Sequence, residues 1–325
     1  MSRPAPAPQH DVVEGVYLCS DLDLQDLFGE AIAAQPGLRV YHPDAVPDPS
    51  RIRFALVWRP AQDAFKAYPN IELVQVIAAG VDGVLGNPGL PDGAVVTRVH
   101  DDEQARIMAG FAAWHVVWHH RQMGHYLSAQ TSATWDRSMI KTLRPPSKVT
   151  VGLLGYGLMG RTIAGTVASM GFPVLAATRT DGPADPGVDR IFGPGAVQTV
   201  AARADILINI LPLTAETDGI LNADLFARMR PGAALIQLGR GEHLVEDDLL
   251  AALNSGHIAG ASLDVFRTEP LPADHPFWTH PRVIVTPHEA SVTSPQAVAE
   301  TLTTSLDEWQ TGQRPTAAVD KATGY

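Results

Sequence analysis

A glycine-rich run between a strand and a helix restricts the possible folds of this chain more than any other feature. Residues 149–160 read Val-Thr-Val-Gly-Leu-Leu-Gly-Tyr-Gly-Leu-Met-Gly, with glycines at the spacing G-x-G-x-x-G. Gly155 permits a tight turn, Gly157 lets a pyrophosphate approach the backbone, and Gly160 lets the next helix pack closely on the strand. We expect that helix over 161–170, with its N-terminal N–H groups facing the anion. This context predicts a dinucleotide-binding domain rather than an ordinary glycine-rich turn.

The end of the second strand, over 174–178, indicates which dinucleotide is bound. Units that bind NAD place Asp or Glu about 20 residues after the glycines, where the carboxylate accepts hydrogen bonds from the ribose 2′-OH. This chain instead carries Thr178, Arg179 and Thr180, a cation flanked by two hydroxyls that suits a 2′-phosphate. Asp181 comes slightly late, in a turn-like Asp-Gly-Pro, and is interpreted as a solvated loop acid. We therefore expect NADP(H), with NAD(H) as the alternative.

The composition restricts the partners and the compartment. The 325 residues are enough for two domains with ample cores. A net charge of −11 without a basic block argues against nucleic acid and anionic membranes as partners. Cys19 is the single cysteine, so we expect no intramolecular disulfide, a cytoplasmic location, and a buried strand position for Cys19. No apolar run is long enough to span a bilayer. Residues 1–8 lack the apolar core of a signal peptide and are expected to be disordered.

Alternating apolar runs predict an α/β fold with two parallel-sheet units. In the first unit we expect a helix over 22–34 and strands over 12–19, 39–41, 54–57 and 73–78. A long helix over 102–126 precedes the glycine-rich strand, and further strands of a doubly wound sheet are expected at 206–211, 233–238, 261–266 and 283–286. A last helix over 295–309 needs a partner surface, for which the first unit is the natural candidate. The predicted boundaries therefore divide the chain into 1–101, 102–291 and 292–325.

Three of these strands are expected to end in polar residues that apolar packing does not explain. They are Arg240, the pair Asp264 and Glu269, and His288. Ligands of doubly wound sheets bind beyond the carboxyl ends of the strands. A guanidinium can hold a substrate carboxylate, an imidazolium can protonate a carbonyl oxygen as hydride arrives, and a carboxylate can orient that imidazole and favour its cation. Each residue alone would be interpreted as a surface charge or a cap, but together they indicate reduction of a 2-oxo acid.

Further motifs carry a family resemblance over nearly the whole chain. They are Ala55-Leu-Val-Trp58-Arg-Pro60, Ala78-Ala-Gly80-Val81-Asp82, Leu211-Pro212-Leu-Thr214 with Thr217 and Ile220, Gly239-Arg240-Gly241, Leu263-Asp264-Val265-Phe266 with Glu269-Pro270-Leu271-Pro272, Thr286-Pro287-His288, and the ending Val319 to Tyr325. With these motifs the chain resembles the NAD(P)-dependent D-2-hydroxyacid dehydrogenases, and most closely their glyoxylate/hydroxypyruvate reductase A type.

The resemblance implies an NADPH-dependent reductase of small 2-oxo acids such as glyoxylate and hydroxypyruvate. It implies a Rossmann cofactor domain, 102–291, inserted in a flavodoxin-like substrate domain that is formed by 1–101 and 292–325. It also implies the catalytic group Arg240, Glu269 and His288, with His288 as the acid in reduction and the base in oxidation. Asp264 would hold the nicotinamide carboxamide, or would merely cap its strand.

The resemblance also implies the binding residues. Gly80 and Val81 would offer backbone N–H groups to the substrate carboxylate, and Trp58 would either wall the substrate pocket or be a core aromatic. The expected substrate-binding residues are Trp58, Ala79, Gly80, Val81, Arg240 and His288. The expected cofactor-binding residues are Gly155, Gly157, Leu158, Met159, Gly160, Thr178, Arg179, Thr180, Leu211, Pro212, Thr217, Leu238, Gly239 and Asp264.

Some positions depart from the family pattern, and other functions share the fold. Gln237 stands where the family commonly has Asn, and Glu289 stands where a residue after the histidine is usually apolar. Formate dehydrogenases have Gln at the position of Glu269, and phosphite dehydrogenases have Lys at the position of Ala79, so both rivals weaken. A nucleotide-sensing corepressor with the same fold stays open as the alternative from another class.

One helical pair of histidines has a spacing that can bind zinc. His115 and His119 are four residues apart, but no glutamate lies within the motif and hydride transfer needs no metal. We therefore expect no metal. The neighbouring Trp114, Val117 and Trp118 indicate a packing or subunit-contact helix, and from this aromatic surface we expect a homodimer.

Overall fold

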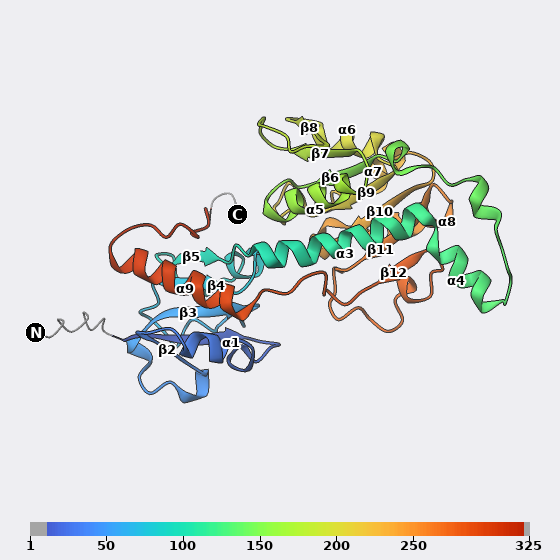
Figure 1. Ribbon diagram of the computed structural model, residues 1–325. Coiled ribbons are helices and arrows are strands. Elements are labelled where there is room, and N and C mark those ends of the chain that lie inside the picture. Colours follow the sequence, from blue (N-terminus) through green and yellow to red (C-terminus); the bar gives the residue numbers. More distant parts are fainter. Residues whose placement is uncertain (1–11, 322–325) are drawn as a thin grey trace, which may run out of the picture. The chain divides into compact units, whose positions relative to one another are not determined.

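The computed structural model describes residues 12–321, and the predicted disorder of residues 1–8 lies outside this range (Figure 1). The chain forms two compact units. Unit 1 combines the residues up to 101 with those from 293 onward, and unit 2 comprises residues 102–292. In the range described, no helix is both long and apolar enough to cross a membrane.

Unit 1 is built on a five-stranded parallel sheet in the order β2-β1-β3-β4-β5. Its strands are β1 (Val13–Cys19), β2 (Leu38–Tyr41), β3 (Ile52–Trp58), β4 (Leu73–Val76) and β5 (Val95–Arg98). Every neighbouring pair is parallel. This is the strand order of flavodoxin-like folds, so the predicted architecture of the substrate domain is confirmed. Cys19 is only partly buried because it ends its strand, which corrects the expectation of a buried position.

The two long helices of unit 1 come from opposite ends of the chain. They are α1 (Leu24–Ala33) and α9 (Pro295–Gln310), and a short helix α2 (Asp82–Leu85) follows β4. Asp23 caps α1, while Ser294 caps α9 with proline at the first helical position. Apolar residues of both helices share one core cluster with the sheet, among them Leu24, Phe28, Ile32, Val298, Leu302 and Leu306. The last helix therefore belongs to the core of unit 1.

Unit 2 contains a seven-stranded parallel sheet in the order β12-β11-β10-β9-β6-β7-β8. Its strands are β6 (Val151–Leu154), β7 (Val174–Thr178), β8 (Val188–Phe192), β9 (Ile206–Asn209), β10 (Ala233–Gln237), β11 (Ile258–Leu263) and β12 (Val283–Val285). The chain fills one side of β6 and then crosses to the other side at β9. This reversal is the switch point of a Rossmann sheet, beside which dinucleotides bind. The predicted α/β class with two doubly wound sheets is confirmed.

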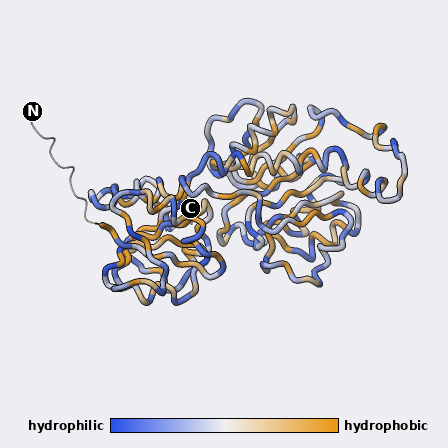
Figure 2. Tube along the Cα trace, turned by 60° about the horizontal axis from the view of Figure 1, so that its bottom comes forward, coloured by the Kyte–Doolittle hydropathy of each residue, from blue (hydrophilic) through white to orange (hydrophobic). Residues whose placement is uncertain are grey.

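Helices cover both faces of the second sheet. They are α3 (Asp102–Arg121), α5 (Leu158–Ser169), α6 (Ala196–Arg203), α7 (Ala223–Arg228) and α8 (Glu246–Asn254). On one face α3 and α5 share a cluster that includes Ala109, Val116 and Ile163. On the other face α6, α7 and α8 contribute Val200, Leu225 and Leu249 to a second cluster. Figure 2 shows the apolar segments gathered inside each unit.

The predicted single helix over 102–126 is interrupted. Helix α3 ends at Arg121, Gln122 has a left-handed φ of +50°, and a separate helix α4 begins, Met123–Thr131. No residue from 121 to 148 is buried, so no core contact holds a continuous helix in this region. We call residues 121–148 the arm, because they extend from the body of unit 2 (Figure 1).

Candidate active site

The carboxyl ends of β10, β11 and β12 bring the predicted acid and base groups of unit 2 to one edge of the sheet. His288 follows β12, and its Nδ1 lies 2.9 Å from Oε2 and 3.1 Å from Oε1 of Glu269, which follows β11. The backbone N–H of Phe266 also donates to Glu269 Oε1, at 3.1 Å. The side chains of His288 and Glu269 are 28% and 18% exposed. The pair is therefore partly shielded, which strengthens its electrostatic coupling.

Asp264 holds the backbone turn that carries His288. His288 has a φ of +58°, a conformation that costs a non-glycine residue roughly 1–2 kcal/mol. The buried carboxylate of Asp264 accepts from Thr286 Oγ1 at 2.6 Å and from the N–H groups of Glu289 and Ala290, both at 3.0 Å. These bonds fit the expected strand-end cap, and the contact with a nicotinamide carboxamide stays a prediction. The Glu289 side chain is exposed to solvent.

Arg240 follows β10 in extended backbone conformation and begins the short helical turn η5 (Gly241–His243). A Cβ atom on Gly241 would lie 1.9 Å from the carbonyl carbon of Phe266. Only glycine therefore lets this segment pack against the loop that leads from β11 to Glu269. The segment that carries Arg240 therefore lies against the loop before Glu269, the residue that binds His288.

The glycine-rich turn after β6 has the geometry that the motif predicts. Gly155 has a φ of +100°, and a Cβ atom there would lie 2.8 Å from the carbonyl oxygen of Ile210. A Cβ on Gly160 would lie 2.0 Å from the carbonyl oxygen of Gly155, so both positions require glycine for packing. A Cβ on Gly157 would meet no protein atom within 4 Å. The space beside Gly157, next to the first turn of α5 with Leu158 and Met159, fits a bound pyrophosphate.

The loop after β7 is held by Thr178 and by Arg190, a residue that no sequence motif indicated. Arg190, on β8, donates to the carbonyl oxygens of Thr180 at 2.7 Å and Pro183 at 2.9 Å. Thr178 Oγ1 donates to Thr180 O at 2.9 Å. Arg179 is exposed at the end of β7, as a contact with a 2′-phosphate requires. The residues present therefore fit a phosphorylated ribose, and Arg190 stabilises the loop that presents them.

Asp181 and Tyr156 complete this end of the site. Asp181 is exposed, and its carboxylate accepts from the backbone N–H of Gly182 at 2.7 Å. Asp181 is therefore an exposed loop acid, as the sequence predicted. The hydroxyl of Tyr156, which lies between Gly155 and Gly157, donates to the Asp185 carboxylate at 2.5 Å. Asp185 also pairs with Arg161 of α5. Because Arg190 also stacks on the Tyr156 ring, these contacts connect the glycine-rich turn to the loop after β7.

The loop after β9 contains three further predicted nucleotide-binding residues, Leu211, Pro212 and Thr217. The Thr217 hydroxyl donates to the carbonyl oxygen of Pro212 at 2.8 Å and accepts from the N–H of Thr214 at 2.8 Å. Leu211 packs on the core of unit 2. These bonds give Thr217 a role in stabilising the turn. Its contact with a nucleotide stays a prediction.

The predicted substrate residues of unit 1 lie at the carboxyl edge of its own sheet. Trp58 ends β3 and packs partly buried between two core clusters. Ala79, Gly80 and Val81 form the loop between β4 and α2. Arg98, which ends β5, donates to the carbonyl oxygen of Ala79 at 3.4 Å. Arg98 is partly buried, and this burial lowers its pKa from the ordinary value. No sequence motif indicated Arg98, but its hydrogen bond supports the loop.

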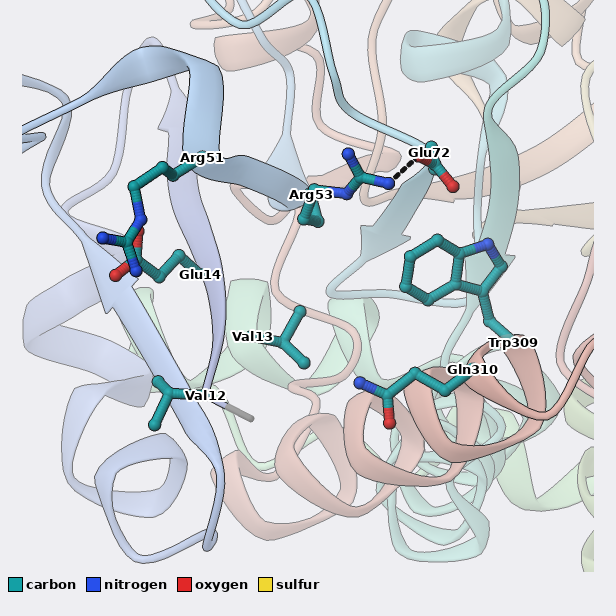
Figure 3. Close-up of a pocket in the computed structure, with 8 residues that line it drawn as sticks. All are labelled: Val12, Val13, Glu14, Arg51, Arg53, Glu72, Trp309 and Gln310. Atoms are coloured by element: carbon teal, nitrogen blue, oxygen red, sulfur yellow. Dashed lines mark hydrogen bonds and ion pairs between the residues drawn. The ribbon is translucent and has the colours of Figure 1, made fainter. Parts of the chain in front are cut away.

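A surface pocket of about 490 Å³ lies elsewhere in unit 1 (Figure 3). It is lined by Val12, Val13, Glu14, Arg51, Arg53, Glu72, Trp309 and Gln310. These residues lie at or near the amino ends of β1, β3 and β4 and the end of α9, whereas the predicted site residues follow the carboxyl ends of the strands. Both arginines are paired with acids, Arg51 with Glu14 at 3.0 Å and Arg53 with Glu72. None of the predicted catalytic or binding residues lines this pocket.

The two histidines at zinc-like spacing have other contacts. His119 Nε2 lies 2.8 Å from the hydroxyl of Ser262, and the His115 ring contacts the rings of Phe111 and Trp114. Burial lowers the pKa of His115 to about 4, and burial together with His115 lowers the pKa of His119 to about 3. Over residues 12–321 no cluster of three or more His, Cys, Asp or Glu side chains could hold a metal ion.

Known proteins resemble this chain in sequence and in fold. Residues 113–290 match the NAD-binding domain of the D-isomer-specific 2-hydroxyacid dehydrogenases. Glyoxylate/hydroxypyruvate reductase A of Serratia proteamaculans is 40% identical over 279 residues, which cover 84% of this chain and 87% of the relative. The enzyme of the same name from Yersinia enterocolitica is 37% identical over the same shares.

Two solved structures share the fold over almost the whole chain. A D-isomer-specific 2-hydroxyacid dehydrogenase from Xanthobacter autotrophicus, in complex with NADPH, is 36% identical with a TM-score of 0.89 and covers 96% of this chain and 99% of its own. An NADPH-dependent glyoxylate/hydroxypyruvate reductase from Sinorhizobium meliloti, in complex with NADP and sulfate, is 33% identical with a TM-score of 0.88 over the same shares. This chain therefore belongs to the D-isomer-specific 2-hydroxyacid dehydrogenase family and is an NAD(P)-dependent oxidoreductase.

Proposed function

We propose that this protein is an NADPH-dependent reductase of small 2-oxo acids, with glyoxylate and hydroxypyruvate as the first substrates to test. The observation that carries the proposal is the hydrogen bond between His288 and Glu269, at the same sheet edge as Arg240 and the glycine-rich turn. The names of the relatives, glyoxylate/hydroxypyruvate reductase A, support the substrate class.

The residues would share the reaction as follows. Arg240 would bind the substrate carboxylate and polarise the neighbouring carbonyl, with the backbone N–H groups of Gly80 and Val81 as further donors. NADPH, when bound, supplies the hydride to the carbonyl carbon. Protonated His288 would give the proton of Nε2 to the carbonyl oxygen, because Nδ1 is engaged by Glu269. Glu269 would hold the ring in one orientation, and the 2-hydroxy acid would leave with His288 neutral.

A steady-state screen tests this function. Purified protein is assayed for reduction with NADPH or NADH and a series of 2-oxo acids. It is assayed for oxidation with NADP+ or NAD+ and formate, phosphite or 2-hydroxy acids. We expect turnover of glyoxylate and hydroxypyruvate with NADPH. Binding of NADPH without turnover of any 2-oxo acid would instead support a nucleotide-sensing protein.

The cofactor preference should follow Arg179. Wild-type enzyme is expected to have a higher kcat/KM with NADPH than with NADH, and Arg179→Asp should narrow or reverse this preference, because it replaces a cation beside the 2′-phosphate with a carboxylate. Arg203→Asp, at the exposed end of α6, makes the same charge change as a control. A wild-type preference for NADH would contradict this role of Arg179.

We also propose that the protein is a homodimer whose subunits meet through α3 and the arm. Exposed large apolar side chains gather there, namely Ile107, Trp114, Val117, Leu127, Trp135, Ile140 and Leu143. A patch of this kind is rarely left in water by a monomer. A second copy of the chain is the simplest partner, since a two-fold axis pairs the same patch with itself.

We further propose that the enzyme acts in the cytoplasm. Cys19 is a free thiol, as is usual in a reducing compartment. Fractionation of cells that produce the protein should recover it with cytoplasmic markers, and recovery with secreted proteins would contradict this location.

A further inference from the structure

A buried polar network surrounds the backbone of Arg240, and the reaction scheme above does not use it. Its members are Asn209, at the end of β9, Gln237, at the end of β10, and His243, at the end of η5, and all three are fully buried. Burial of polar side chains is unfavourable unless their hydrogen bonds are made. The bonds of these three residues therefore indicate what the network does.

Two of the three side chains bind the backbone of Arg240 from opposite sides. The Arg240 N–H donates to His243 Nδ1 at 3.0 Å, and the Arg240 carbonyl oxygen accepts from Gln237 Nε2 at 2.8 Å. The donor side chain, Gln237, is three residues before Arg240, and the acceptor side chain, His243, is three residues after it. Both polar groups of this one peptide segment are thereby tied to side chains that the sheet core surrounds.

Asn209 connects the two side chains. Its Nδ2 donates to Gln237 Oε1 at 2.7 Å and to His243 Nδ1 at 2.9 Å. Because Nδ1 of His243 accepts from both Asn209 and Arg240, the ring proton must be on Nε2, which lies 3.2 Å from the carbonyl oxygen of Pro212. The neutral ring thus also joins Arg240 to the loop after β9.

Gly239 makes room for this arrangement. A Cβ atom at this position would lie 2.7 Å from His243 Nδ1 and 2.9 Å from Asn209 Nδ2. Any larger residue would push the ring and the amide away from the Arg240 backbone. Glycine at position 239 is therefore required for the hydrogen bonds that His243 and Asn209 make.

We propose that His243 is a positioning residue for Arg240, acting with Gln237 and Asn209. This inference rests on the proposed role of Arg240 in holding the substrate carboxylate. By fixing the peptide groups on both sides of Arg240, the network sets the position from which the guanidinium reaches the substrate. A displacement of about 1 Å at such a group costs on the order of 100-fold in rate.

Two substitutions of His243 separate its bonds from its bulk. His243→Phe keeps a ring and removes both nitrogens. His243→Asn keeps an acceptor for Arg240, since its amide oxygen is bonded to Cγ as Nδ1 is. At saturating NADPH we expect His243→Phe to lower kcat/KM for the 2-oxo acid at least tenfold, and His243→Asn to restore most of the loss. Circular dichroism and the thermal midpoint show whether each variant is folded.

A double-mutant cycle with Arg240→Ala tests whether the effect passes through Arg240. If His243 acts by positioning, His243→Phe should add almost nothing to the loss in Arg240→Ala. Additive losses, or a His243→Phe enzyme with wild-type kcat/KM, would overturn the proposal. Should His243→Phe not fold, Gln237→Met removes the amide on the other side of Arg240 and enters the same cycle.

The variant Arg240→Ala shows which of the two proposals fails, the role of Arg240 or the positioning role of His243. Near-normal kcat/KM in Arg240→Ala would overturn the role of Arg240 itself and the positioning role with it. A large loss in Arg240→Ala together with a wild-type His243→Phe enzyme would overturn only the positioning role.

Discussion

At the scale of single residues, the pair of His288 and Glu269 should be visible in the pH dependence of the reaction. Reduction requires the protonated imidazole and oxidation the neutral one, so reduction should slow and oxidation accelerate as the pH rises. In Glu269→Gln an amide replaces the carboxylate that binds Nδ1, so the ring is held less firmly and kcat should fall in both directions. Rate profiles for both directions, measured on folded protein, check this. A Glu269→Gln enzyme with wild-type rates would separate Glu269 from the proton transfer.

His288 itself should be indispensable for turnover. His288→Ala should lower kcat by roughly 100-fold or more, which is the usual scale of general acid catalysis, while NADPH binding is largely kept. The matched variant Glu289→Ala removes the exposed neighbour and should leave kcat close to that of the wild type. If His288→Ala turned over normally, the proton would have to come from another group.

At the scale of one element, a buried histidine of α3 should make unit 2 sensitive to acid. His115 is 1% exposed, its Nδ1 has no hydrogen-bond partner in the described part of the chain, and burial lowers its pKa to about 4. Since the unfolded side chain has a pKa of about 6.5, the unfolded state binds the proton more tightly. The free energy of unfolding should therefore be highest above pH 6.5 and fall as the pH decreases toward 4.

Urea unfolding at pH 7 and pH 5 measures this effect. At pH 5, about 1.5 units below the pKa of the unfolded side chain, the free energy of unfolding should be about 2 kcal/mol lower because of His115. His115→Leu should reduce the difference between the two pH values by that amount. An equal difference in wild type and variant would show that His115 is not what makes unit 2 sensitive to acid.

At the scale of the whole molecule, the arm should decide the oligomeric state. Trp135 is 92% exposed, and burial of an indole of 150 Å² or more at about 25 cal/mol per Å² makes a large contribution to association. Light scattering at micromolar concentration should give a dimer for the wild type. Trp135→Ser should raise the dissociation constant of the dimer at least tenfold. Leu27→Ser also removes an exposed apolar side chain, but from α1, and should leave that constant unchanged. A monomeric wild type would contradict the dimer.

Local signals made much of the fold and of the candidate site predictable. The glycine spacing predicted the turn after β6, because the left-handed Gly155 and the crowded Gly160 tolerate no side chain. The strands before Arg240 and His288 were predictable because both are mainly apolar runs. The strands β5 and β8 were not predicted. Both lie at the edge of their sheet, and both mix polar or charged residues with apolar ones. Edge strands depend on their neighbours more than on their own composition.

The sequence by itself determined the dinucleotide-binding unit, the family, and the residue types at the strand ends, because each depends on neighbours only a few positions away. Only the tertiary structure decided which of these residues meet. His288 and Glu269 are 19 residues apart, and His243 and Asn209 are 34 apart. The order of the strands brings each pair within hydrogen-bond distance. Burial of Asn209, Gln237 and His243 arises from the same packing, which no local pattern encodes.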